Sequence, residues 1–196
     1  MSARKKLVFT AARLFHAKGY NNTSVQDILE KSAVFRNNFY YHFQSKEQLG
    51  FEVLERRMSQ WYEFVLNPSL DDRKLSARER INALLDRVSL LGCSKEGEFG
   101  CPFGNLALEM SCIHEPFRQK LSDFFRSISR RLTQCLEEGM KSGDFPQNLP
   151  SDEIADFAIA LIQGSFLLRK THRDPEIFQK NIEMLRRLFG EDKDHA

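Results

Sequence analysis

The stretch TSVQDILEKSAVFRNNFYYHFQSKEQL, residues 23–49, decides the fold. Thr23 with Gln26 three residues later matches a capping-box pattern, which predicts that a short helix begins here. A tight connection at residues 32–34 then leads into a second short helix from Arg36 to His42. Two short helices joined by a tight turn are typical of the helix-turn-helix, in which the second helix enters the major groove of DNA.

The flanking residues extend this pattern in both directions. Apolar residues recur at helical spacing from Leu7 to Phe15, and Gly19 suits the left-handed conformation that often ends a helix. Ser45 with Gln48 repeats the capping-box pattern and predicts a long helix to about Leu66, where a proline follows. Three short helices are therefore expected at the N-terminus, followed by a long one.

Helical patterns continue to the C-terminus. After a polar linker at residues 71–74, Ser76 and Glu79 form a third capping-box pattern, which predicts a helix to about Cys93 before the Gly-rich segment 97–104. Further helix starts are predicted at Pro102, Pro116, Ser151 and the Asp174-Pro175 pair, with the last helix ending near Gly190. Because no alternating strand pattern interrupts them, the sequence predicts an all-α fold of nine helices.

Charge is distributed unevenly along the chain. Residues 1–46 hold eight Lys or Arg against two acidic residues, whereas residues 47–196 hold 21 basic against 25 acidic residues. A cationic surface attracts nucleic-acid phosphates through counterion release, and a mildly acidic remainder does not. The charge by itself fits a solvated surface equally well, so DNA binding is inferred from the motifs.

The composition predicts a cytoplasmic protein with its own hydrophobic core. Hydrophobic residues make up 41% of the 196 residues, enough for one or two small domains. The longest uncharged run of the apolar C-terminal part, residues 157–168, is too short to span a membrane, and the N-terminal residues do not match a secretory signal. The four cysteines lack metal-binding spacing and are expected to be free thiols.

Several short strings in the first quarter of the chain match one family. They are Ala11-Ala12-Arg13-Leu14-Phe15, Gly19-Tyr20, Thr23-Ser24-Val25-Gln26-Asp27-Ile28, Phe39-Tyr40-Tyr41-His42-Phe43 and Ser45-Lys46-Glu47-Gln48-Leu49. Together they resemble the TetR family of bacterial repressors, which the remaining residues resemble in helical layout and length. The resemblance implies a helix-turn-helix DNA-binding domain at residues 1–47 and a regulatory, ligand-binding and dimerisation domain at residues 48–196.

The resemblance also implies how such a protein acts. It would be a homodimer through its last two helices, with each protomer presenting its third helix to one half of a near-palindromic double-stranded operator. A small-molecule or electrophile effector, whose identity the sequence does not give, would change the separation of the two reading helices. Repression, rather than activation, follows from the resemblance alone.

Candidate DNA contacts cluster around the predicted reading helix. Arg36, Asn37 and Asn38 lie at its N-terminal end, where Arg can pair with guanine and Asn with adenine. Tyr40 and Lys46 match family positions that hold phosphate. Thr23 and Ser24 could both cap a helix and contact phosphate. The full candidate set is Thr23, Ser24, Arg36, Asn37, Asn38, Tyr40, Tyr41 and Lys46.

Two positions depart from the family pattern. Ala33 stands in the turn where the family usually has Gly, and Phe35 stands before the third helix where the family commonly has a small hydroxyl residue. Phe is a poor helix cap. We hypothesise that Phe35 acts as an apolar wedge or contacts a thymine methyl group, the alternative being that it packs on the surface of its own domain.

The C-terminal part carries features of both an interface and an effector pocket. Apolar stripes at residues 154–166 and 177–189, with small Ala158 and Gly164, predict buried helix faces, either between protomers or within one chain. The chain also has 17 Phe, so an apolar pocket is expected, in which a few polar groups would orient a ligand. The candidate lining residues are Trp61, Phe103, Asn105, His114 and Gln163, for each of which a core or surface role is the alternative.

The segment Gly100-Cys101-Pro102-Phe103-Gly104-Asn105 carries the most specific regulatory hypothesis. Pro102 suits a first helical position, which places Cys101 at the helix cap, where backbone N–H groups and the helix dipole favour a thiolate. The segment resembles a Gly-Cys-x-x-Gly-Asn motif in a subset of TetR-like regulators, some of which respond to electrophiles or oxidants. Cys101 is therefore a candidate sensor, and the alternative is a small buried residue in a structural turn.

Two other protein classes share single features with this sequence. An enzyme would need a Cys-His pair such as Cys112 with His114, but residues two apart on a helix do not face each other. No Gly-rich phosphate loop or metal-binding spacing is present, so neither catalysis nor a cofactor is expected. An architectural nucleoid protein would share the basic end of the chain but would not need a Phe-rich second domain.

Overall fold

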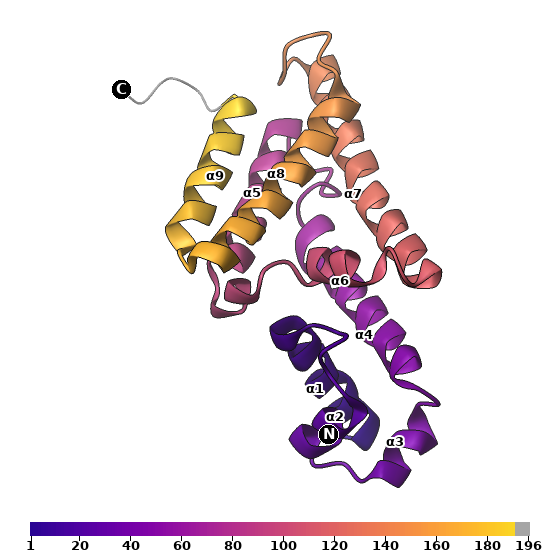
Figure 1. Ribbon diagram of the computed structural model, residues 1–196. Coiled ribbons are helices and arrows are strands. Elements are labelled where there is room, and N and C mark those ends of the chain that lie inside the picture. The colour runs from indigo at the N-terminus through magenta and orange to yellow at the C-terminus, as the bar shows by residue number, and fades with distance from the viewer. Residues whose placement is uncertain (191–196) are drawn as a thin grey trace. The chain divides into compact units, whose positions relative to one another are not determined.

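The structure, a computed structural model, describes residues 1–190, and within this range it is built of helices without strands (Figure 1). The α-helices are α1 (Ala3–Lys18), α2 (Val25–Ser32), α3 (Arg36–His42), α4 (Lys46–Trp61), α5 (Ala77–Cys93), α6 (Pro102–Met110), α7 (Glu115–Ser142), α8 (Ser151–His172) and α9 (Pro175–Leu188). A π-helix, η1 (Tyr62–Leu66), continues α4, and a 3-10 helix, η2 (Lys95–Phe99), follows α5. The predicted all-α fold of nine helices is confirmed. None of the helices described is both long and apolar enough to cross a membrane.

The chain forms two compact units, each made of two stretches of sequence. The first unit consists of Met1–Gln60 with Pro102–Leu121, and the second of Trp61–Cys101 with the remainder from Ser122 onward. Thus α6 and the first turns of α7 belong to the same unit as the helix-turn-helix, although the sequence places them far apart. The boundary after residue 47 between a DNA-binding and a regulatory domain stays a prediction.

The first unit is held together by an apolar cluster that α1, α2, α3 and α4 share. Its buried members are Leu7, Val8, Ala11, Ile28, Leu29, Val34, Phe39, Phe43, Leu49 and Val53. Leu14 and Phe15 are partly buried against this cluster. Phe39 of the seven-residue α3 and its C-cap residue Phe43 are buried in this cluster, whereas most other side chains of the helix are exposed.

The cap of α2 differs from the prediction by one residue. Ser24, not Thr23, caps the helix: its hydroxyl accepts a hydrogen bond from the Asp27 N–H at 3.0 Å, and the Asp27 carboxylate accepts one from the Ser24 N–H at 2.8 Å. The Thr23 hydroxyl instead donates to the Gly19 carbonyl at 2.7 Å. The Thr23 to Gln26 capping box was therefore wrong, and the overlapping Ser24 to Asp27 pattern is the one that forms.

Helix α2 ends at Ala33, which adopts the left-handed conformation with φ 52° and ψ 41°. Its N–H donates to the carbonyls of Leu29 and Glu30. A left-handed backbone costs a non-glycine residue about 1–2 kcal/mol because its Cβ approaches the following carbonyl. The turn of this helix-turn-helix is therefore strained where the family usually has glycine.

In the second unit, α9 packs closely against α5 and α8. Phe178 of α9 is fully buried, and its ring lies 4.6 Å from that of Phe166 of α8. A Cβ atom added at Gly92 of α5 would come within 2.0 Å of the Phe178 ring, so only glycine permits this approach. The predicted helix starts at Ser76, which forms its capping box with Glu79, and at Pro175 are confirmed.

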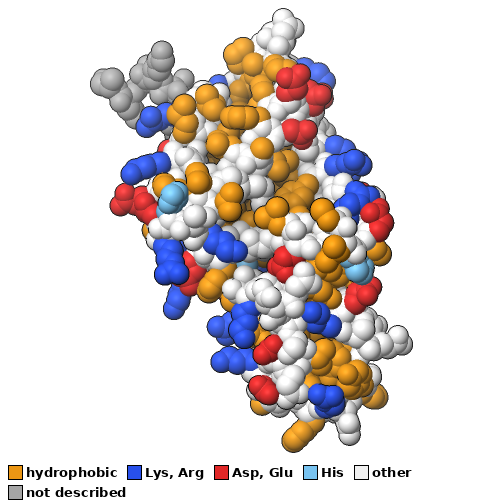
Figure 2. All heavy atoms as spheres, viewed as in Figure 1, with side chains coloured by type: hydrophobic (Ala, Val, Ile, Leu, Met, Phe, Trp, Pro, Cys, Tyr) orange, Lys and Arg blue, Asp and Glu red, His pale blue; other side chains and the backbone are white. Residues whose placement is uncertain are grey.

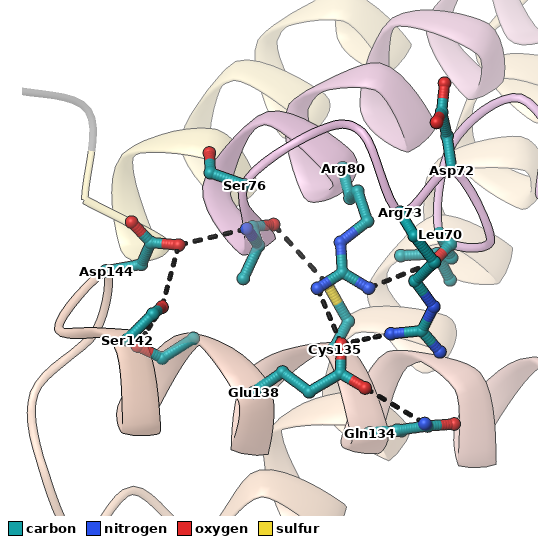
Figure 3. A network of polar contacts seen from close by, with 12 residues as sticks. Leu70, Asp72, Arg73, Ser76, Arg80, Gln134, Cys135, Glu138, Ser142 and Asp144 are labelled. Atoms are coloured by element: carbon teal, nitrogen blue, oxygen red, sulfur yellow. Dashed lines mark hydrogen bonds and ion pairs between the residues drawn. The ribbon is translucent and has the colours of Figure 1, made fainter.

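A polar network joins the start of α5 to α7 (Figure 3). Arg80 is only 5% exposed, and its Nη2 donates to the Glu138 carboxylate at 2.7 Å. Arg73 and Gln134 also donate to this carboxylate. Burial acts to raise the pKa of Glu138, but the hydrogen bonds from Arg80, Arg73 and Gln134 outweigh it and hold the pKa below its usual value. Next to it, burial raises the pKa of the Cys135 thiol to about 11, so this thiol stays protonated.

Substituting Glu138 by Gln tests this network. We expect the free energy of unfolding at pH 7 to fall by about 2–4 kcal/mol, because buried Arg80 keeps its charge and loses its carboxylate partner. Since folding lowers the pKa of Glu138, the wild-type advantage should be complete above about pH 5 and should shrink as the pH falls through the folded-state pKa. Urea unfolding between pH 7 and pH 3.5 measures both effects.

The matched control is Glu137→Gln on the exposed side of α7, which we expect to change stability by less than about 0.5 kcal/mol. An equal loss in both variants, or a Glu138→Gln deficit that does not shrink at low pH, would show that the network does not carry this stabilisation.

Substituting Ala33 by Gly tests the strained turn. We expect the free energy of unfolding to rise by about 0.5–1 kcal/mol, because relief of the left-handed strain exceeds the entropy that glycine adds to the unfolded chain. The same change at Ala83, inside α5, should lower it by about 1 kcal/mol. Thermal or urea unfolding measures the change in stability of both variants. A loss of stability in Ala33→Gly would contradict the interpretation of a strained turn.

Candidate DNA-binding and effector sites

Helix α3 presents a row of polar side chains to the surface. Arg36, Asn37 and Asn38 are all exposed, whereas Phe39, the next residue, is fully buried. Tyr40 and Tyr41 are also exposed, toward the C-terminal end of the helix. The predicted base-reading residues therefore share one accessible helix end, which is fixed to the core by its buried neighbour.

Arg36 is positioned by a residue that the sequence analysis did not assign to the site. Its Nη2 donates to Oε1 of Gln26 at 3.1 Å, and Nε2 of Gln26 donates to Glu30 at 2.8 Å. Gln26 and Glu30 lie one turn apart on α2, so this helix orients the guanidinium on α3. The sequence assigned Gln26 only a role in capping α2. In the structure Gln26 does not cap the helix and instead orients Arg36.

The candidate phosphate contacts Thr23, Ser24 and Lys46 all have structural roles in the free protein. Thr23 is fully buried, and Ser24 caps α2. Lys46 Nζ donates to the carbonyls of Tyr20 and Thr23, both at 3.1 Å, and lies 4.3 Å from the centre of the Tyr20 ring. Burial lowers the pKa of Lys46, and the charge of Glu109 opposes this shift. Their contacts with DNA phosphate stay predictions.

The turn between α1 and α2 is also held by a carboxylate from α6. Glu109 Oε1 accepts a hydrogen bond from the Tyr20 N–H at 3.2 Å, and its Oε2 accepts one from the Asn21 N–H at 2.9 Å. Gly19 makes room for this carboxylate, because a Cβ atom there would lie 2.7 Å from Oε1. We call this arrangement, in which Glu109 binds the N–H groups of the turn and Lys46 binds its carbonyls, the α1–α2 clamp.

The Tyr20 side chain fills the space beside the clamp. Its ring packs against Phe15 and Phe117, and burial, followed by the charge of Glu47, raises its pKa to about 12. A cavity of about 30 Å³ lies next to it in the first unit, with Phe103 of α6 in its lining. Such a cavity holds about one water molecule and is too small for an effector.

The candidate effector residues fall in both units. His114 lies in the first unit, directly before α7: its Nδ1 accepts from the Phe117 N–H at 3.4 Å, and its Nε2 lies 3.2 Å from Glu47. Asn105 is half-buried on α6. Trp61 and Gln163 are half-buried in the second unit, where the Trp61 ring lies 6.4 Å from that of Phe124. Their role toward an effector stays a prediction.

Cys101 lies at the start of α6 and forms no disulfide. It is 5% exposed and immediately precedes Pro102, the first residue of the helix. The chain passes from the second unit into the first between these two residues. The other three cysteines form no disulfide either: Cys93 and Cys112 are exposed, and Cys135 is buried.

The stripes on α8 and α9 divide between core and surface. Most of their members are buried within the chain, among them Ala158, Phe166, Phe178 and Ile182. Of the two alternatives for Ala158, the contact within one chain holds, because its side chain is 1% exposed in the single chain. Gly164, in contrast, faces open space. Apolar side chains reach the surface of the second unit (Figure 2), and those on α8 and α9 are Phe157, Leu167, Leu168, Met184 and Leu188.

Comparison with known proteins identifies both parts of the chain. Residues 7–53 match the family described as bacterial regulatory proteins of the tetR family, and residues 77–185 match the tetracyclin repressor-like C-terminal domain. An HTH-type transcriptional regulator of the lacX 3′ region in Lactococcus lactis subsp. lactis is 31% identical, over 96% of this chain and 93% of the relative. The HTH-type transcriptional repressor DhaR of Mycobacterium sp. strain GP1 is also 31% identical, over 88% of this chain and 85% of the relative.

Solved structures agree with this assignment. A TetR transcriptional regulator from Chloroflexus aurantiacus superimposes with a TM-score of 0.86 at 22% identity, covering 96% of this chain and 94% of that chain. The reduced form of Escherichia coli NemR gives a TM-score of 0.81 at 25% identity, covering 94% of this chain and 95% of the NemR chain. The match spans the helix-turn-helix and most of the second unit, so the chain belongs to the TetR family of helix-turn-helix transcriptional regulators and is not an enzyme.

Proposed function

We propose that this chain is a homodimeric, cytoplasmic repressor that binds a near-palindromic operator and is released by a small molecule or by modification of Cys101. The observation that supports operator reading is the exposed Arg36, Asn37 and Asn38 beside fully buried Phe39. Their groups match guanine and adenine edges in the major groove. A helix anchored by its buried face presents these groups with little freedom, which favours sequence-selective contact over general attraction to phosphate.

The dimer is proposed to form through α8 and α9. Phe157, Leu167, Met184 and Leu188 are large apolar residues that stay exposed in the single chain. Burying such side chains between protomers is favourable, and a two-fold axis would present two copies of α3 to the two halves of the operator. In this arrangement each half of the operator binds one protomer.

The α1–α2 clamp is proposed to connect α6 with DNA reading. Glu109, near the C-terminal end of α6, binds the turn that precedes α2, and α2 in turn orients Arg36 through Gln26. Cys101 directly precedes the other end of α6. Movement of α6 caused by an effector, or by an adduct on this thiol, would therefore act on the turn through hydrogen bonds to its backbone.

Two modes of release are compatible with this proposal. One is modification of Cys101 by an electrophile or oxidant, in keeping with its resemblance to the Gly-Cys-x-x-Gly-Asn subset. The similarity to NemR, whose structure is described as a reduced form, supports this mode. The other mode is a non-covalent apolar ligand, in which case the buried Cys101 is purely structural.

Arg36→Ala tests operator reading on duplexes that the purified protein enriches from a random pool. We expect operator affinity to fall by about 1–3 kcal/mol per half-site and selectivity to relax at one base position, because one bidentate base contact is lost. Arg13→Ala, on an exposed position of α1, is the matched control. Equal weakening on all duplexes, with base preferences unchanged, would assign Arg36 to phosphate rather than to a base.

Cys101→Ser separates the two modes of release. If the thiol is the sensor, N-ethylmaleimide should release wild-type protein from its operator and leave the variant bound, because the Cys101 sulfur adds to the maleimide double bond and a serine hydroxyl does not. Cys93→Ser and Cys112→Ser, at the exposed thiols, should behave as wild type. Release that persists in Cys101→Ser would exclude this thiol and favour a non-covalent effector.

Glu109→Gln tests the clamp. The amide can accept one hydrogen bond but places a donor against the other backbone N–H, so we expect a loss of about 1–3 kcal/mol in unfolding free energy and weaker operator binding. Glu115→Gln makes the same chemical change at an exposed carboxylate of the first unit and should leave operator affinity unchanged. Equal operator affinity in Glu109→Gln and Glu115→Gln would show that the clamp does not contribute to DNA reading.

A further inference from the structure

Phe35 is an exposed apolar side chain beside the reading residues, with 82% of its surface accessible. The apolar cluster of the first unit includes its neighbours Val34 and Phe39 but not Phe35. The alternative that Phe35 packs on the surface of its own domain is therefore wrong. Its ring contributes nothing to the core and is available for a contact outside the chain.

The backbone fixes where this ring lies. Phe35 is the N-cap residue of α3, with φ −69° and ψ 149°, and its carbonyl accepts hydrogen bonds from the Asn38 and Phe39 N–H groups at 3.0 and 3.2 Å. Its side chain makes no capping hydrogen bond. An aromatic ring thus occupies the cap position directly before Arg36, at the end of the helix that carries the base-reading groups.

The position limits what the ring can recognise. On the major-groove edges of the bases, donors and acceptors are read by polar side chains, and the one apolar feature is the 5-methyl group of thymine. A Phe ring can neither donate nor accept a conventional hydrogen bond, and placing it against the N4 amino group of cytosine would desolvate a donor without pairing it. At this position a thymine is therefore favoured over a cytosine.

We propose that Phe35 reads the 5-methyl group of one thymine in each operator half-site, at a base pair next to those contacted by Arg36, Asn37 and Asn38. This inference rests on the proposed function as an operator-binding protein and adds a specificity-determining residue to it. Removal of one buried methyl group from such a contact should weaken binding about fourfold per half-site, from a transfer free energy of about 0.8 kcal/mol.

The experiment replaces each thymine of the enriched operator, one symmetric pair at a time, by deoxyuridine, which lacks only the 5-methyl group. Dissociation constants are measured by fluorescence anisotropy for full-length wild type, Phe35→Ala and Phe35→Leu. We expect one position per half-site at which the symmetric change to uridine weakens wild-type binding about fifteenfold, since each of the two half-sites contributes about fourfold. At that position Phe35→Ala should not distinguish the two bases, and Phe35→Leu should keep part of the preference.

Phe9→Ala is the matched control, because Phe9 is a 54% exposed aromatic residue of the same unit on α1. It should keep the full preference for thymine. Since the Phe35 side chain is outside the core, thermal unfolding of Phe35→Ala should match that of wild type, which excludes misfolding as the cause.

Three outcomes would overturn the inference. If wild type binds thymine and uridine equally at every position, Phe35 reads no methyl group, while operator binding itself stands. If Phe35→Ala weakens all duplexes alike and the preference for thymine persists, the ring acts as a wedge without reading the methyl group. If no operator is enriched from the pool, the proposed function fails and this inference fails with it.

Discussion

The turn between α1 and α2 is the constraint on which the reading helix depends. Glu109 accepts hydrogen bonds from its N–H groups, and Lys46 donates hydrogen bonds to its carbonyls. Opposite charges therefore hold one short backbone segment. Charge-assisted hydrogen bonds of this kind are stronger and more directional than apolar contacts. Helix α2 starts directly after this turn and orients Arg36 through Gln26, so the clamp and the reading residues belong to one continuous set of contacts.

Much of the fold could be predicted because helix starts are encoded locally. Ser76 with Glu79 and the proline at Pro175 each place a cap or a suitable φ angle within one turn, and both helices begin as expected. The one misplaced cap arose because Thr23 and Ser24 both satisfy the capping pattern. Burial decides between them: Thr23 lies inside the first unit and bonds to Gly19, which leaves Ser24 to cap the helix.

The candidate site was only partly predictable. Exposure of Arg36 to Asn38 follows from the helical period around the buried Phe39, which is a local property. Glu109 was not assigned to the site, because its partners lie 88 and 89 residues away and nothing in the intervening sequence indicates the contact. Likewise, the sequence does not tell which residues of an apolar stripe are used within the chain: Ala158 proved to be core, whereas Phe157 next to it is exposed.

Selection of bound duplexes from a random pool by the purified full-length protein tests the central claim most directly. If α3 reads base edges and the chain is a dimer, the enriched sequences should converge on a near-palindrome whose half-sites are centred about one helical turn, or a multiple of it, apart. Binding without an enriched sequence, or enrichment of a single unrepeated element, would contradict the account of a symmetric, sequence-reading repressor.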